Sequence, residues 1–170
     1  MNKYKLVFSL AVISLIVSGI FFFSEQSGTQ SHSLSNSLAS YLTEKWVAYF
    51  NLDYLNDNQI GLLKLILAGP IRKLAHILIY TILGFCSFTG VWLVRNRKVS
   101  FFHVFIVIFF VFVVASCDEL NQHFSSGRGA SFSDVLIDTF GGCIGIYLLY
   151  LIRDFIRHLN NGLNNFRHNK

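Results

Sequence analysis

The chain has 170 residues, of which 53% are hydrophobic and only 14% are charged, and its mean hydropathy is +0.51. Soluble domains carry about 25% charged residues, so the composition excludes an ordinary soluble domain. The formal net charge of +5 does not indicate a nucleic-acid partner, because the basic residues flank apolar segments rather than forming a basic tract.

Four long apolar segments follow one another along the chain. About 20 helical residues cross a hydrocarbon core roughly 30 Å thick, and each segment reaches that length with its flanks. We therefore predict an all-α fold, a single domain built as a four-helix transmembrane bundle. The predicted helices cover residues 6–24, 71–94, 99–120 and 132–153.

The first apolar segment could instead be a signal peptide, with Lys3 and Lys5 as its charged start. Its apolar run, Leu6–Phe23, is longer than a typical signal-peptide core of about 7–15 residues. No A-x-A-like cleavage site follows Phe23. We therefore expect a retained membrane helix.

Residues 25–70 form a long connection before the second membrane helix, and residues 154–170 form a tail. Apolar residues at near-helical spacing over 33–50 and 57–68 predict one or two short amphipathic helices in this connection. Gly69-Pro70 should separate the second of them from the membrane helix that follows.

Orientation follows from the short flanks, since Lys and Arg concentrate on the cytoplasmic side. One side has nine basic residues: Lys3, Lys5, Arg95, Arg97, Lys98, Arg153, Arg157, Arg167 and Lys170. The other side has five: Lys45, Lys64, Arg72, Lys73 and Arg128. We predict a multi-pass membrane protein with both termini in the cytoplasm.

Polar residues gather at the predicted outer ends of the second, third and fourth membrane helices. Ionisable groups at membrane depth are costly, and such a cluster indicates a functional site. The candidate ligand-binding residues are Arg72, Lys73, His76, Tyr80, Asp118, Glu119, Gln122, Arg128, Asp134 and Asp138.

The spacing of these residues predicts how they meet. Asp118 and Glu119 lie near a helix C-terminus, where acids are disfavoured, so Lys73 or Arg128 should pair with one of them. Two other helices should present their N-termini to the site. Asp138 shares a helix face with Gly141 and Gly145, and this face should pack closely against another helix. Asp138 should therefore point into the bundle near Lys73, His76 or Tyr80.

Three motifs together resemble the VanZ-like family over about residues 5–152. They are Arg72-Lys73-x-x-His76-x-x-x-Tyr80, Asp118-Glu119-x-x-Gln122-x-Phe124-x-x-Gly127-Arg128 and Asp134-x-x-x-Asp138-Thr139-x-Gly141. The stretch Ser24-Glu25-Gln26 is similar to the family's F-S-S-Q type sequence, altered at Glu25. The resemblance implies a small bacterial multi-pass membrane protein. VanZ itself is associated with teicoplanin resistance.

The leading functional hypothesis is a site in the outer leaflet for an anionic lipid or a lipid-linked cell-envelope precursor. A link to glycopeptide resistance is a further hypothesis, which the resemblance suggests. Arg72, Lys73 and Arg128 would hold its phosphate or carboxylate group. Membrane lipids are thus the expected partners, and the sequence makes no prediction of oligomeric state.

Two alternatives stay open. In the first, the protein is an intramembrane hydrolase or transferase for a lipid-linked substrate, with His76, Asp118, Glu119 and Asp138 as the candidate catalytic groups. These residues could supply general acids and bases, or several of them could hold a divalent metal ion. In the second, the cluster only forms structural ion pairs. No metal-binding motif or phosphate loop is found in the sequence, so we expect neither a metal nor a cofactor.

Overall fold

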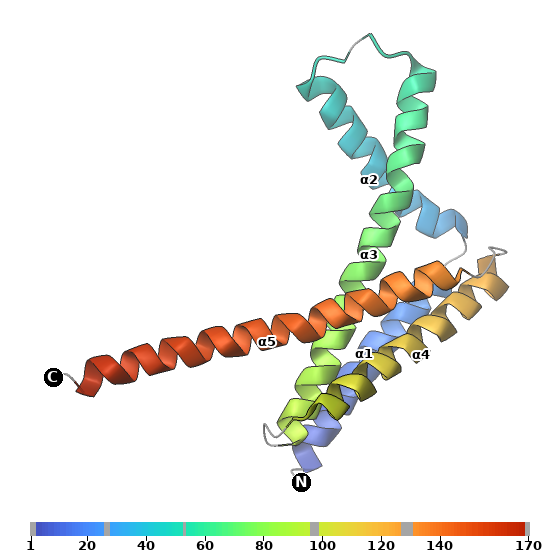
Figure 1. Ribbon diagram of the computed structural model, residues 1–170. Coiled ribbons are helices and arrows are strands. Elements are labelled where there is room, and N and C mark those ends of the chain that lie inside the picture. The colour runs from blue at the N-terminus through green and yellow to red at the C-terminus, as the bar shows by residue number, and fades with distance from the viewer. Residues whose placement is uncertain (1–2, 26–27, 53, 96–98, 127–130, 169–170) are drawn as a thin grey trace.

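The computed structural model describes residues 3–25, 28–52, 54–95, 99–126 and 131–168. Within these residues the chain forms five helices and no strand (Figure 1). They are α1 (Lys3–Glu25), α2 (Gly28–Tyr49), α3 (Asp57–Val94), α4 (Phe101–Ser126) and α5 (Phe132–His168).

Four of the helices in this described part, α1, α3, α4 and α5, are long and apolar enough to cross a membrane. The predicted all-α fold with four membrane helices is therefore confirmed. α5 crosses α3, and the second half of α5 extends beyond the other helices (Figure 1). Most side chains of residues 150–161 on this extension are exposed.

The predicted break at Gly69-Pro70 does not occur, because α3 runs without interruption from Asp57 to Val94. A capping box starts the helix: the Asn56 side chain accepts from the Gln59 N–H, and the Gln59 side chain accepts from the Asn56 N–H. Pro70 removes one backbone donor. The turn before it packs against α2, with Ala68 buried in the contact, and this packing offsets the loss.

The first half of α3 and α2 form a helical hairpin that extends from one end of the bundle (Figure 1). Ala39 and Thr43 of α2 are buried, and Lys64 pairs with Glu44 at 3.2 Å. Tyr41 and Trp46 are exposed, and such aromatic residues are typical of a membrane interface. A helix in the first connection was predicted, although α2 is longer than expected.

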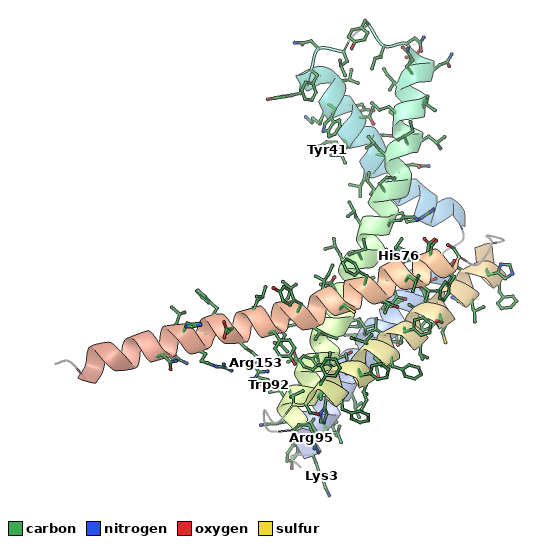
Figure 2. All side chains as sticks on the ribbon, in the orientation of Figure 1. Lys3, Tyr41, His76, Trp92, Arg95 and Arg153 are labelled. Atoms are coloured by element: carbon green, nitrogen blue, oxygen red, sulfur yellow. The ribbon has the colours of Figure 1, made fainter. Side chains whose placement is uncertain are left out.

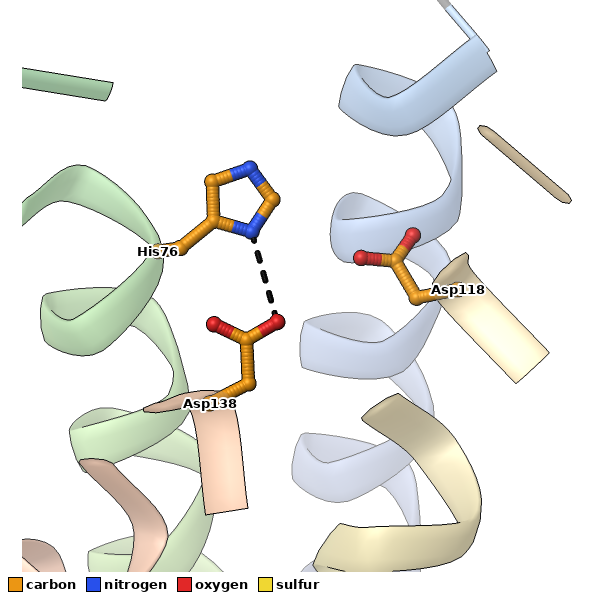
Figure 3. A group of neighbouring side chains, drawn as sticks. All are labelled: His76, Asp118 and Asp138. Atoms are coloured by element: carbon orange, nitrogen blue, oxygen red, sulfur yellow. Dashed lines mark ion pairs between the residues drawn. The ribbon is translucent and has the colours of Figure 1, made fainter. Parts of the chain in front are cut away.

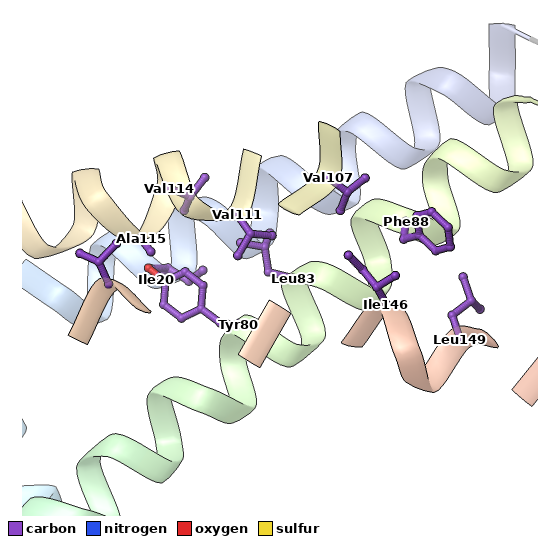
Figure 4. Close-up of a cluster of buried hydrophobic side chains, with 11 residues drawn as sticks. Ile20, Tyr80, Leu83, Phe88, Val107, Val111, Val114, Ala115, Ile146 and Leu149 are labelled. Carbon is purple, nitrogen blue, oxygen red and sulfur yellow. The ribbon is translucent and has the colours of Figure 1, made fainter. Parts of the chain in front are cut away.

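The core of the bundle lies where α1, α3, α4 and α5 meet (Figure 4). Tyr80, Leu83 and Phe88 of α3 and Val111 of α4 are completely buried there. Ile146 of α5 packs into the same cluster and is 4% exposed. These contacts fix the helices relative to one another, and Tyr80 links the apolar core to the polar groups at one end.

Glycines set the spacing between α3 and α5. A Cβ atom on Gly141 would lie 2.7 Å from the Ile77 carbonyl oxygen, and one on Gly145 would lie 2.6 Å from the Phe85 backbone nitrogen. Real Cβ atoms do not approach backbone this closely. The predicted close packing at Gly141 and Gly145 is therefore confirmed, and it brings Asp138 next to α3.

Gly145→Ala should destabilise the folded protein by about 1–3 kcal/mol, because the added methyl group must push the two backbones apart. The matched control is Gly61→Ala on α3, where nothing lies within 4 Å of the added Cβ. That change should stabilise the helix by up to about 1 kcal/mol. Thermal unfolding in detergent measures both effects, and equal midpoints for the two variants would contradict the close packing.

Candidate functional site

Three helices each contribute one ionisable side chain to a buried cluster: His76 from α3, Asp118 from α4 and Asp138 from α5 (Figure 3). His76 Nδ1 lies 3.5 Å from Asp138 Oδ2. One side-chain nitrogen or oxygen from each residue lies within 4.8 Å of the other two. Asp118 and Asp138 are only 1% and 3% exposed, so the cluster is enclosed on most sides.

Asp118 is held through one of its two oxygens. The Tyr80 hydroxyl donates to Asp118 Oδ2 at 3.2 Å, and Gln122 Nε2 donates to the same oxygen at 3.1 Å. Asp118 Oδ1 is buried and has no hydrogen-bond partner among the described residues. Hydrogen bonds from Tyr80 and Gln122 thus compensate part of the cost of burying this carboxylate.

Lys73 does not pair with Asp118 or Glu119, so that part of the sequence prediction is wrong. Its ammonium group binds Asp134 Oδ1 at 3.0 Å, and both side chains are partly exposed. Lys73 lies one turn before His76 on α3, where the first turn of α5 is within reach. Glu119 accepts instead from the Ser131 backbone N–H at 2.7 Å. Arg128, the other predicted cation, lies outside the described residues.

A small cavity of about 60 Å³ adjoins the cluster, because His76 and Asp138 also line its wall. It has room for a few water molecules or one small ionic group. Its lining residues come from α3, α4 and α5: Arg72, Lys73, His76, Glu119, Gln122, Asp134, Ile137 and Asp138. Tyr80 and Asp118 do not line the cavity. Tyr80 belongs to the apolar core and donates a hydrogen bond to Asp118. All predicted site residues that the structure describes therefore belong to one site.

The electrostatic setting differs from the prediction in one respect. Two helix N-termini were expected at the site, but α3 begins at Asp57, far from His76. The N-terminus of α5 does lie at the cavity, because Asp134 in its first turn lines the wall. The cavity thus has the two cations Arg72 and Lys73 and the positive end of one helix dipole, beside several acids.

The structure adds Ser24 of α1, to which the sequence assigned no role. Ser24 lies beside Asp118, where its hydroxyl can donate a hydrogen bond to the carboxylate. The only sequence signal was its place in the stretch that resembles the family's F-S-S-Q type sequence. Ile137 was also missed, because an isoleucine in an apolar segment gives no signal.

The helices and the largely enclosed cluster define a class: a multi-pass membrane protein with a polar site between three of its helices. The chain belongs to the VanZ/LLP1 family, whose family model matches residues 8–153. The matched range includes every described residue of the cavity. A search of curated proteins and a search of solved structures returned no match.

Proposed function

We propose that this membrane protein binds the phosphate-bearing headgroup of an anionic lipid or a lipid-linked cell-envelope precursor. The observation that carries the proposal is the cavity between the middle of α3, the C-terminal end of α4 and the N-terminal end of α5. Arg72 and Lys73 line it together with the pair formed by the partly exposed His76 and the buried Asp138. Charge-assisted hydrogen bonds from arginine and lysine suit phosphate oxygens.

The surface around the cavity suits a lipid rather than a soluble anion. Leu74 and Leu78 of α3 are 59% and 64% exposed, and Leu120 of α4 and Leu136 of α5 are 52% and 50% exposed. These side chains lie within two residues of the groups that line the cavity or form the cluster. Acyl chains could therefore contact apolar helix surface while the headgroup occupies the cavity.

The double variant Arg72→Gln/Lys73→Gln should bind phosphatidylglycerol at least about tenfold more weakly, because two charge-assisted hydrogen bonds are lost. Native mass spectrometry of the detergent-solubilised protein measures the bound lipid. The control is Lys45→Gln/Lys64→Gln, which removes the same charge from the exposed Lys45 and the partly exposed Lys64 on the α2–α3 hairpin, away from the cavity. Equal lipid retention by the two double variants would contradict the proposed site.

We propose that the site opens to the outer leaflet. Lys3, Arg95 and Arg153 lie at the opposite end of the bundle from His76, which supports a cytoplasmic location for that end (Figure 2). Arg153 also stacks over Trp92, with 4.8 Å between the guanidinium carbon and the ring centroid. Arginine and tryptophan are both typical of a membrane interface.

Single-cysteine labelling tests this orientation in a background without Cys86, Cys117 and Cys143. An impermeant thiol reagent applied to intact cells should label a cysteine at the exposed Asn56 and should miss one at the exposed Ser100. The two positions lie at opposite ends of the 38-residue α3 and its connection to α4. The reverse labelling pattern would place the cavity in the cytoplasmic leaflet.

A second function, hydrolysis or transfer at the lipid phosphate, is favoured by the pairing of His76 with Asp138 at 3.5 Å. A carboxylate that orients a histidine is a common arrangement for general acid–base catalysis. If the site is catalytic, His76→Gln should abolish turnover of a lipid-linked phosphate ester while lipid binding persists. If His76→Gln weakens lipid binding and the parent protein shows no turnover, the site binds headgroups without catalysis.

A further inference from the structure

We propose that His76, Asp118 and Asp138 bind one divalent transition-metal ion. The three side chains converge from α3, α4 and α5, and their nearest nitrogen and oxygen atoms all lie within 4.8 Å of one another. The inference goes beyond headgroup binding and does not depend on it, because the three residues form the cluster without any lipid.

The donor set defines the class of ion. One imidazole nitrogen and two carboxylate oxygens suit first-row divalent ions such as Mn²⁺, Fe²⁺ and Zn²⁺. No thiol takes part, so the set has no preference for soft ions. Three protein donors beside an open cavity also leave positions for water or a phosphate oxygen, as in catalytic rather than structural metal sites.

The distance between His76 and Asp138 supports this reading. A charge-assisted hydrogen bond between nitrogen and carboxylate oxygen is about 2.7–2.9 Å long. The observed 3.5 Å is longer. Two ligands held about 2.1 Å from a tetrahedral ion lie about 3.4 Å apart, which is close to the observed value.

A second, independent observation comes from Asp118. Its side chain is 1% exposed, and its Oδ1 has no hydrogen-bond partner in the described residues, although Oδ2 accepts from both Tyr80 and Gln122. Buried polar groups without partners are rare and call for a ligand or an ion.

Charge balance points the same way. Asp118 and Asp138 carry two negative charges into a nearly closed site, while Lys73 is already paired with Asp134 at the cavity rim. A divalent cation with a neutral His76 would neutralise both carboxylates. The ion would lie at the base of the cavity, where Arg72 and Lys73 line the wall.

The test uses the full-length protein in detergent, stripped of metal with a chelator and titrated with Mn²⁺ in the absence of added lipid. Electron paramagnetic resonance of free Mn²⁺ should show about one ion bound per chain. Pulsed measurements on the bound ion should show coupling to a histidine nitrogen. His76→Gln and Asp138→Asn should each weaken binding at least about tenfold, and Asp118→Asn should do the same.

The matched control is Asp154→Asn, an exposed acid on the extension of α5, which should leave Mn²⁺ binding unchanged. Absence of nitrogen coupling in the parent protein would overturn the proposal even if a variant failed to fold. Equal binding by the parent and the three site variants would also overturn it and would mark adventitious binding to exposed carboxylates. Because no lipid is added, these results are independent of headgroup binding.

Discussion

Asp118→Ala should destabilise the folded protein by about 3 kcal/mol. The substitution leaves the buried Tyr80 hydroxyl without its acceptor, removes the acceptor of Gln122 and opens a cavity next to the core. Asp118→Asn should recover most of the loss, because an amide oxygen can still accept from Tyr80. Denaturant unfolding in detergent with chelator present measures these effects without a metal contribution.

The control for this prediction is Asp154→Ala. Asp154 has a side chain that is 61% exposed, and its ion pairs among the described residues are with Arg157 and His158 on its own helix. Its removal should change the free energy of unfolding by less than about 0.5 kcal/mol. Similar losses for Asp118→Ala and Asp154→Ala would show that the buried hydrogen bonds contribute little.

Asp138→Asn should fold normally and abolish function in cells. The amide keeps the size of the side chain and its close packing beside α3, but it removes the charge that faces His76. A deletion strain complemented with each variant at matched membrane abundance measures the effect as sensitivity to antibiotics that act on the cell envelope. Asp138→Asn should match the empty vector, and Asp154→Asn should match the parent.

Full complementation by Asp138→Asn would show that Asp138 has a structural role. That result would favour the alternative in which the cluster only forms structural ion pairs. Combining Asp138→Asn with His76→Gln tests whether the two residues act together. If His76 and Asp138 act together, the double variant should be no worse than either single variant. Additive losses would indicate two independent contributions.

The membrane helices could be predicted because apolar length alone defines them. Gly141 and Gly145 also gave a usable signal, since small residues one turn apart permit close helix packing. The convergence of His76 and Asp138 then followed from the side of the membrane on which the polar ends of the apolar segments were predicted to lie. These predictions rest on spacing along single helices, which the sequence contains directly.

The errors concern contacts between helices and the ends of helices. The start of α3 at Asp57 could not be predicted from Pro70, because packing against α2 overrides the local preference of proline. The pairing of Lys73 with Asp134 instead of Asp118 depends on how far α3 and α5 are displaced along their axes, which Gly84 and Gly145 set through backbone contact. A single sequence does not encode that displacement in any short motif.

Photocross-linking from inside the cavity tests headgroup binding most directly. A benzophenone amino acid at Ile137, which lines the cavity, should capture a phosphate-bearing lipid in native membranes, identified by mass spectrometry. The adduct should disappear in the Arg72→Gln/Lys73→Gln background, whereas adducts from the exposed position Ile66 should be unaffected. Capture of the same lipids from Ile137 in equal yield in the parent and in the Arg72→Gln/Lys73→Gln variant would contradict headgroup binding at this site.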